Sequence, residues 1–291
     1  MLTVCYRNLL LYFRNKSEVF FSLLAALISF ILYVAFLQDT IGGDWKNLPG
    51  HAEFLDLWLI GGTLGITAIT TTLSSLSQKV EDYEKSTEND FLLTGISRFS
   101  LNFGYVLSAA VIGFIMQIVV FLVMFLYFHF VDDLSISFSK LGFLIILMLL
   151  GSLLNAVVNA VIMRFVYNRN TLSAVSTVIG TVSGFLVGAY IPLGILPSFA
   201  QFLVKLTPGA YVSSLYRQVL LDDNLQKFFP VLSKREQFVE EMGIQLKWGK
   251  LLNYSQSLLI TVLLFVAFLI ILVLIEYLLN SRKVKPTFRT L

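Results

Sequence analysis

Few residues in this 291-residue chain have the types and spacing that catalysis or metal binding requires. The two histidines, His51 and His129, lie far apart in the sequence, and no His, Cys, Asp and Glu cluster has metal-ligand spacing. The Gly-x-x-x-x-Gly-Lys-Ser/Thr pattern that holds nucleotide phosphates is missing, as is the Gly-x-Ser-x-Gly pattern of esterases. We therefore expect no catalytic residue, no metal site and no cofactor bound by this chain.

The charged segment 81–98 carries the clearest signal for an interaction. Thr87 is placed to cap a short helix with acidic residues in its first turn, and Gly95 is placed to end it. The hydrophobic residues at 91–93 and Ile96 would then form an apolar knob ringed by charge. Such a patch indicates contact with another protein, although a helix packed on the chain's own surface would show the same pattern.

Two apolar segments carry small or hydroxyl side chains at helical spacing. Such stripes let helix backbones approach closely, so they could form a subunit interface, line a substrate path, or serve internal packing alone. The residues concerned are Gly61, Gly65, Thr67 and Thr70 in the first segment, and Ser176, Gly180, Gly184 and Gly188 in the second.

Polar residues inside the apolar segments are few. Gln117, Asn155 and Asn159 are expected to hydrogen-bond between helices, and Glu276 to reach the membrane surface or pair with Arg282. They form no buried acidic or histidine chain of the kind that a proton-driven carrier needs.

The elements that must position these residues follow from composition. The chain is 57% hydrophobic and 13% charged, with a mean hydropathy of +0.80, whereas soluble domains carry about 25% charge. Lipid is therefore the expected solvent. The net charge of +3 is spread over several loops and does not indicate nucleic acid, and the single cysteine excludes an intrachain disulfide.

Six apolar segments approach or exceed the roughly 20 residues that span a bilayer. Only helices or closed barrels satisfy the backbone in lipid, and no period-2 alternation indicates a barrel. We expect an all-α membrane protein with six transmembrane helices and a single transmembrane domain over 1–291. The predicted spans are about 19–37, 55–76, 99–130, 141–166, 172–191 and 257–279.

Three further segments complete the predicted domain. Residues 1–16 form an amphipathic helix suited to the headgroup layer, and 77–98 form a cytoplasmic loop. Within 192–255, prolines and glycines bracket the short apolar piece 198–206, which predicts outer re-entrant helices. An amphipathic surface helix is the alternative for that piece.

The orientation follows from Lys and Arg in the short loops, which gather on the cytoplasmic side. The opposite short loops hold only Lys46 and Lys140, so both termini are predicted to be cytoplasmic. The basic residues on the cytoplasmic side are Arg7, Arg14, Lys16, Lys79, Lys85, Arg98, Arg164, Arg169, Arg282, Lys283, Lys285 and Arg289.

Together these features resemble the membrane subunit of type-2 ATP-binding-cassette exporters over nearly the whole chain. The resemblance depends on the basic amphipathic N-terminal helix, the cytoplasmic termini and the six spans. Its more specific parts are the acidic loop leading into Asp90-Phe91-Leu92-Leu93-Thr94-Gly95-Ile96-Ser97-Arg98 and the broken segment that ends in Pro208-Gly209-Ala210-Tyr211.

The resemblance implies a coupling helix, after the second span, that docks on a separate ATPase subunit carrying ATP and Mg. It also implies a dimer with a second permease copy, either identical or related, in which spans two and five face the dimer axis and line the path. The coupling residues would be Glu84, Glu88, Asp90, Phe91, Leu92, Leu93, Gly95 and Arg98.

The function implied is an ATP-driven permease in a bacterial plasma membrane, exporting an amphipathic or lipophilic compound. The long outer loop favours the drug, lipid or toxin branch over the polysaccharide branch, and multidrug permeases and streptococcal haemolysin or pigment exporters are similar in size. A secondary carrier, a lipid or polysaccharide exporter, and a lipid-modifying enzyme using His129, Asp132 and Asp133 are the alternatives.

Overall fold

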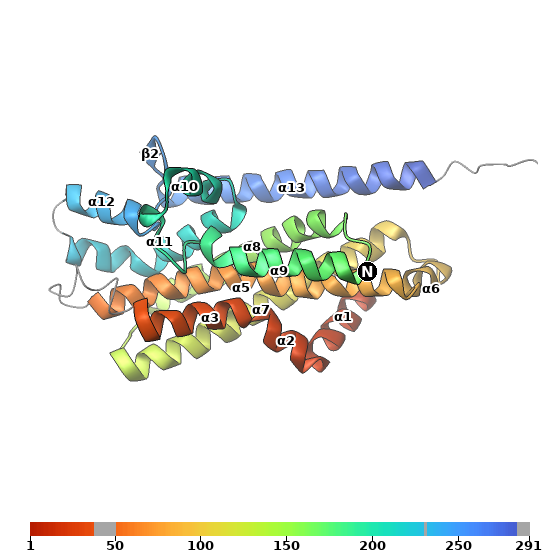
Figure 1. Ribbon diagram of the computed structural model, residues 1–291, viewed down its shortest axis with the longest axis horizontal. Helices are drawn as coiled ribbons and strands as arrows, with labels where there is room; N and C mark the ends of the chain where they lie inside the picture. The colour runs from red at the N-terminus through yellow and green to blue at the C-terminus, as the bar shows by residue number, and fades with distance from the viewer. Residues whose placement is uncertain (38–50, 230–231, 284–291) are drawn as a thin grey trace, which may run out of the picture.

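The computed structural model describes residues 1–37, 51–229 and 232–283. This part of the chain is almost entirely helical, as predicted, and its helices lie lengthwise in an elongated bundle (Figure 1). The exception is a short antiparallel hairpin of β1 (Lys247–Trp248) and β2 (Lys250–Leu251).

Four described helices are long and apolar enough to cross a membrane, and a bent pair of helices would make a fifth. The pair is broken at Leu23 by a bend of 46° and continues into a π-helical turn, η1 (Tyr33–Leu37). The four helices are α5 (His51–Glu84), α7 (Arg98–Asp132), α8 (Phe138–Met163) and α13 (Tyr254–Lys283), and the pair is α2 (Lys16–Ser22) with α3 (Leu24–Leu32).

The fifth predicted span, 172–191, is shorter in the structure. Helix α9 (Arg169–Leu186) has 18 residues, many of them Ser or Thr, and is not among the candidate spans of the described chain. It ends because Gly188 adopts φ +62°, a conformation that other residues rarely take, and Pro192 follows. The described residues therefore form a multi-helix membrane protein with four or five candidate spans.

The predicted break before the last span is present. A 3₁₀ turn, η2 (Leu193–Ile195), leads to α10 (Ser198–Lys205) and then α11 (Pro208–Phe228), which starts at a proline because the first helical residue needs no amide hydrogen. Helix α11 packs against α5, α8 and α13, whereas α10 lies on the surface. With α12 (Leu232–Glu241), these helices lie at the end of the bundle opposite α6 (Thr87–Leu93) (Figure 1).

The N-terminal segment forms α1 (Leu2–Arg14), and its predicted apolar face is divided between two environments. Leu2 and Tyr6 are exposed, with Leu10 and Phe13, as an interfacial helix requires. The other side was not predicted: Val4, Asn8 and Tyr12 are buried, and α1 packs on α7.

Helix α5 is the centre of the bundle and packs against α3, α7, α8, α9 and α11. Its small residues allow this approach. A Cβ added at Gly61 would lie 2.8 Å from the Arg217 side chain, and one at Gly65 would lie 3.2 Å from Ser213. Thr67 is buried and donates to its own helix. Gly61, Gly65 and Thr67 therefore serve packing within this chain.

Two of the three predicted polar residues bond between helices. Gln117 on α7 donates to Ser152 on α8 at 2.6 Å and accepts from Tyr216 on α11. Asn159 on α8 donates to the Ile69 oxygen on α5 at 2.9 Å. These bonds satisfy polar atoms that water cannot reach. Asn155 instead donates to Gly151 in its own helix.

A fully buried arginine joins four segments at the end of the bundle opposite α6. Arg217 on α11 is 2% exposed, and its guanidinium lies 4.5 Å from the Trp58 ring centroid. It donates to the main-chain oxygens of Trp58 at 3.2 Å, Gly188 at 2.8 Å and Gly243 at 3.4 Å. These bonds link α11 to α5, to the end of α9 and to the end of α12.

Replacing this arginine is expected to destabilise the whole protein. Arg217→Met should lower the free energy of unfolding by about 3 kcal/mol. The buried carbonyl oxygens lose their hydrogen-bond donors, and the methionine side chain fills the space of the guanidinium less well. Denaturation of the purified protein in mild detergent measures this loss. The control, Lys250→Met on exposed β2, should change stability by roughly 0.5 kcal/mol or less; equal stability of the two variants would contradict this role.

Candidate functional site

The predicted coupling segment forms helix α6 between α5 and α7. Gly95 ends it with φ +83°, as predicted, and Glu88 and Asp90 lie in its first turn. The expected cap at Thr87 is wrong. Ser86 occupies the capping position with φ 60°, its side chain makes no capping bond, and Thr87 is the first helical residue.

The predicted apolar knob is divided between the chain's own core and its surface. Phe91 and Ile96 are half-buried and pack against a core cluster that includes residues of α5 and α7, and the Arg7 guanidinium lies 5.2 Å from the Phe91 ring centroid. Leu92 is half-buried as well, whereas Leu93 is 86% exposed. Leu93 is therefore the apolar residue of α6 most available to another protein.

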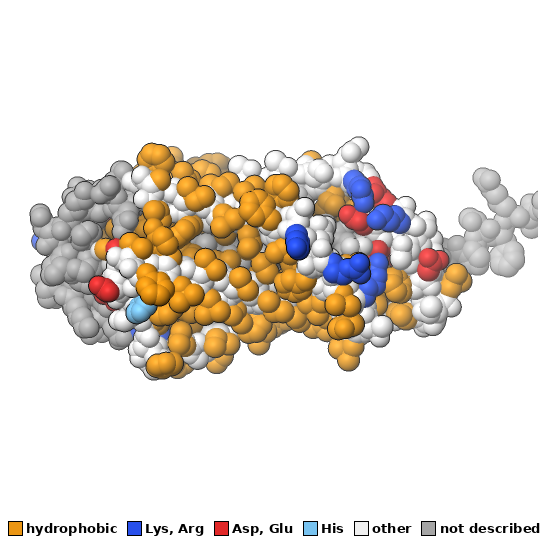
Figure 2. Space-filling view, turned by 90° about the horizontal axis from the view of Figure 1, so that it is seen from below, with side chains coloured by type: hydrophobic (Ala, Val, Ile, Leu, Met, Phe, Trp, Pro, Cys, Tyr) orange, Lys and Arg blue, Asp and Glu red, His pale blue; other side chains and the backbone are white. Residues whose placement is uncertain are grey.

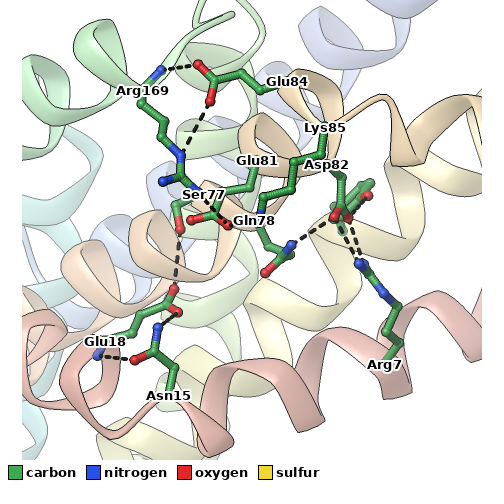
Figure 3. A network of polar contacts seen from close by, with 11 residues as sticks. Arg7, Asn15, Glu18, Ser77, Gln78, Glu81, Asp82, Glu84, Lys85 and Arg169 are labelled. Carbon is green, nitrogen blue, oxygen red and sulfur yellow. Dashed lines mark hydrogen bonds and ion pairs between the residues drawn. The ribbon is translucent and has the colours of Figure 1, made fainter.

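An ion pair holds α1 against the α6 end of α5. Arg7 donates two bonds to the Asp82 carboxylate, at 2.6 and 2.9 Å, and the Asp82 side chain is 2% exposed (Figure 3). Gln78 and Tyr105 donate to the same carboxylate. A bidentate pair with its remaining lone pairs satisfied is a strong and directional contact.

A second set of ion pairs connects α9 to the last turn of α5. The Arg169 guanidinium lies 3.2 Å from Glu81 and 3.4 Å from Glu84, and its backbone amide donates to Glu84 at 2.6 Å (Figure 3). Within the predicted segment, Arg98 pairs with Glu88 at 2.9 Å. Glu88 and Arg98 thus brace α6 within this chain, Glu84 holds the end of α5 against α9, and Asp90 is exposed.

Glu276 has different partners from those predicted. It is 1% exposed on α13, where Asn102 donates to it at 2.9 Å and Arg164 lies 3.4 Å away. Lys79 lies 3.9 Å from the same carboxylate. The carboxylate therefore joins α13 to α5, α7 and α8; the side chain of Arg282, its predicted partner, lies outside the described residues.

A cleft of about 840 Å³ lies between α2, α3, α5 and α9. Thr70, Ser176 and Gly180 line it, and a Cβ added at Gly180 would meet nothing within 4 Å. The stripe on α9 is divided here, because Gly184 is covered by the Tyr190 ring and Gly188 lies at the helix end near Arg217. The path residues predicted from spacing therefore lie partly in one open cleft and partly in the core.

A family model for the ABC-2 type transporter matches residues 1–221 of this chain. The chain belongs to the ABC-2 type transporter family. This ABC-2 permease is a multi-pass membrane transport subunit and is not itself a catalytic enzyme. The matched region includes α6 and the cleft and ends within α11. A comparison with curated proteins returned no match.

The surface of this ABC-2 permease separates apolar and charged side chains. Apolar side chains cover the middle of the face in Figure 2, and Lys and Arg gather toward the α6 end. The chain's N-terminus and the end of α13 lie at that same end (Figure 1). Three residues used to predict orientation, Lys46, Lys285 and Arg289, lie outside the described residues.

Sequence reasoning missed several charged residues that the fold brings together. Asp56 on α5 is fully buried and accepts from the Tyr33 hydroxyl at 2.7 Å. Asp82, Glu18 and Arg217 also have roles that their local sequence does not indicate. Of these residues, Asp56 alone could have been found from the sequence, because a carboxylate within an apolar helix indicates a buried polar contact. No group of three metal-ligating side chains is present in the described ranges.

The sole cysteine of this permease reports on the Arg7–Asp82 pair. Cys5 is buried two residues from Arg7 in α1, and burial raises the pKa of its thiol, so less thiolate is present at a given pH. In the wild type, maleimide labelling should be slow at pH 7 and increase at higher pH. Arg7→Ala should speed labelling by roughly tenfold, because α1 loses a charged hydrogen-bond pair.

Mass spectrometry of the labelled chain measures this rate. Arg14→Ala is the control, since Arg14 is exposed at the end of the same helix, and it should label at the wild-type rate. Unchanged labelling in Arg7→Ala would show that the ion pair does not hold α1 in place.

Proposed function

We propose that this chain is the permease subunit of an ATP-driven exporter of an amphipathic or lipophilic compound, energised by a separate ATPase that docks on α6. The observation that carries the proposal is Leu93, an aliphatic side chain that is 86% exposed on a helix braced by the Glu88–Arg98 ion pair. An exposed apolar residue on a rigid charged support is suited to binding a protein partner.

Family membership supports the same proposal, since ABC-2 permeases normally work with an ABC ATPase subunit. ATP and Mg would be bound by that subunit. The surroundings of α6 also suit force transfer, because Arg7 on α1 lies over the α6 residue Phe91 and pairs with Asp82 on α5. Arg169 joins α9 to α5 through Glu81 and Glu84. A displacement of α6 would therefore reach three helices.

The orientation and assembly belong to the same proposal. The Lys and Arg side chains at the α6 end favour a cytoplasmic location for that end and both termini, in a bacterial plasma membrane. A second permease copy, identical or related, would face the cleft that holds Thr70 and Gly180. The drug, toxin, pigment and lipid branches remain the cargo classes proposed, with a polysaccharide exporter as the alternative.

Substitution of Leu93 tests the docking site. Leu93→Asp should reduce co-purification of the ATPase from native membranes by about tenfold or more, because a buried apolar contact is replaced by a charge. The ATPase is identified by mass spectrometry from its nucleotide-binding motifs, and the two chains are quantified together. The permease itself should fold normally, since Leu93 is exposed.

The matched control is Ile195→Asp, which introduces the same charge at a 71% exposed aliphatic residue at the opposite end of the bundle. It should co-purify the ATPase as the wild type does. If the wild-type chain associates with no ATPase, the exporter proposal fails; if both variants lose the ATPase equally, α6 is not its docking site.

A further inference from the structure

The carboxylate of Glu18 is held at one wall of the 840 Å³ cleft. Asn15 begins α2 by accepting from the Glu18 amide, and its side chain donates back to the carboxylate at 3.2 Å. Ser74 on α5 donates to the other carboxylate oxygen at 3.2 Å, and Ser77 donates to it at 3.3 Å (Figure 3 shows Ser77). Three neutral donors thus fix the position of a negative charge.

This charge has no cationic partner among the described residues. No Lys or Arg nitrogen of that part of the chain lies within ion-pair distance of Glu18. The neighbouring carboxylates, Glu81 and Glu84, are already paired with Lys85 and Arg169. Glu18 and Glu81 are the charged residues that line the cleft, so Glu18 is its unpaired carboxylate.

The remaining walls of the cleft combine apolar and aromatic side chains with Ser and Thr residues, most of them on α9. Leu24 and Ile28 line it from α3, and three rings line it from α2, α9 and the segment after α9. Those rings are Phe21, Phe185 and Tyr190. Aromatic faces attract organic cations, and a volume of this size holds a drug-sized molecule.

We propose that this cleft binds an amphipathic organic cation, whose charge contacts the Glu18 carboxylate and whose apolar part lies against the aromatic and aliphatic walls. An unpaired carboxylate beside apolar surface favours such a ligand, because a cation neutralises the carboxylate while its hydrocarbon covers the walls. The inference rests on the proposed function, in which this ligand is the cargo, and it names the cargo's chemical class.

Two probes of the same shape and opposite charge test the proposal. Purified permease in mild detergent should bind tetraphenylphosphonium in preference to tetraphenylborate, as measured by equilibrium dialysis. Glu18→Gln should weaken tetraphenylphosphonium binding by about tenfold and leave tetraphenylborate binding unchanged or stronger, because one ionic contact is lost while size and shape are kept. The control, Glu236→Gln on exposed α12, should bind both probes as the wild type does.

A second variant keeps the test independent of the stability of Glu18→Gln. Gly180→Leu adds a side chain into open space in the cleft and should weaken tetraphenylphosphonium binding without changing any charge. Unchanged binding in both variants would overturn the proposal, as would equal affinity of the wild type for the two probes. The proposal would also be overturned if Glu18→Gln kept its tetraphenylphosphonium binding but changed its oligomeric state. That result would place Glu18 in a contact between two copies of the chain.

These outcomes are separable from those of the docking experiment, because binding to the purified permease needs no ATPase. If the chain binds the probes charge-selectively but associates with no ATPase, the proposed cation site stands and the exporter proposal fails. If the chain assembles with an ATPase but shows no charge selectivity, the exporter proposal stands and the proposed cation site fails.

Discussion

A guanidinium keeps its proton at any pH that a cell reaches, so a buried arginine must find hydrogen-bond acceptors inside the protein. Arg217 finds them in three main-chain oxygens, and one face of its guanidinium lies on the Trp58 ring. Because main-chain oxygens are placed by the backbone, the position of Arg217 depends on the paths of α5, α9 and α12 together. Gly61 and Gly62 are needed for the same reason, since a Cβ at either would meet the arginine.

The features predicted correctly are those with a local physical cause. Long apolar segments indicated the helices, Gly95 indicated the end of α6, and Pro208 indicated the start of α11. The 172–191 span was overestimated because Ser and Thr interrupt its apolar residues and Gly188 ends the helix. The glycine stripes were found, but their surroundings were not, since four-residue spacing is the same for packing within a chain and between chains.

The charged contacts at the α6 end could not be predicted, because they join residues distant in the sequence. Arg7 and Asp82 are 75 residues apart, and Arg169 and Glu84 are 85 apart. The sequence around each of these residues has the composition of an ordinary solvated loop. Only the fold shows that most of these charges are mutually paired and that Glu18 is solvated by neutral donors instead. The candidate cargo site is thus defined by Glu18, a carboxylate without a cationic partner among the described residues.

The length of α5 has a mechanical consequence. Its 34 uninterrupted residues span about 51 Å, and neighbouring helices enclose most of that length, so bending is restricted. The helix is thus a long, enclosed connection between the α6 end and the region of the buried arginine. A tilt of about 5° at one end displaces the other by roughly 4 Å, which exceeds the length of a hydrogen bond. The Arg217 acceptor on α5, the Trp58 oxygen at 3.2 Å, is therefore sensitive to small tilts of that helix, whereas the Gly188 and Gly243 acceptors lie on other segments.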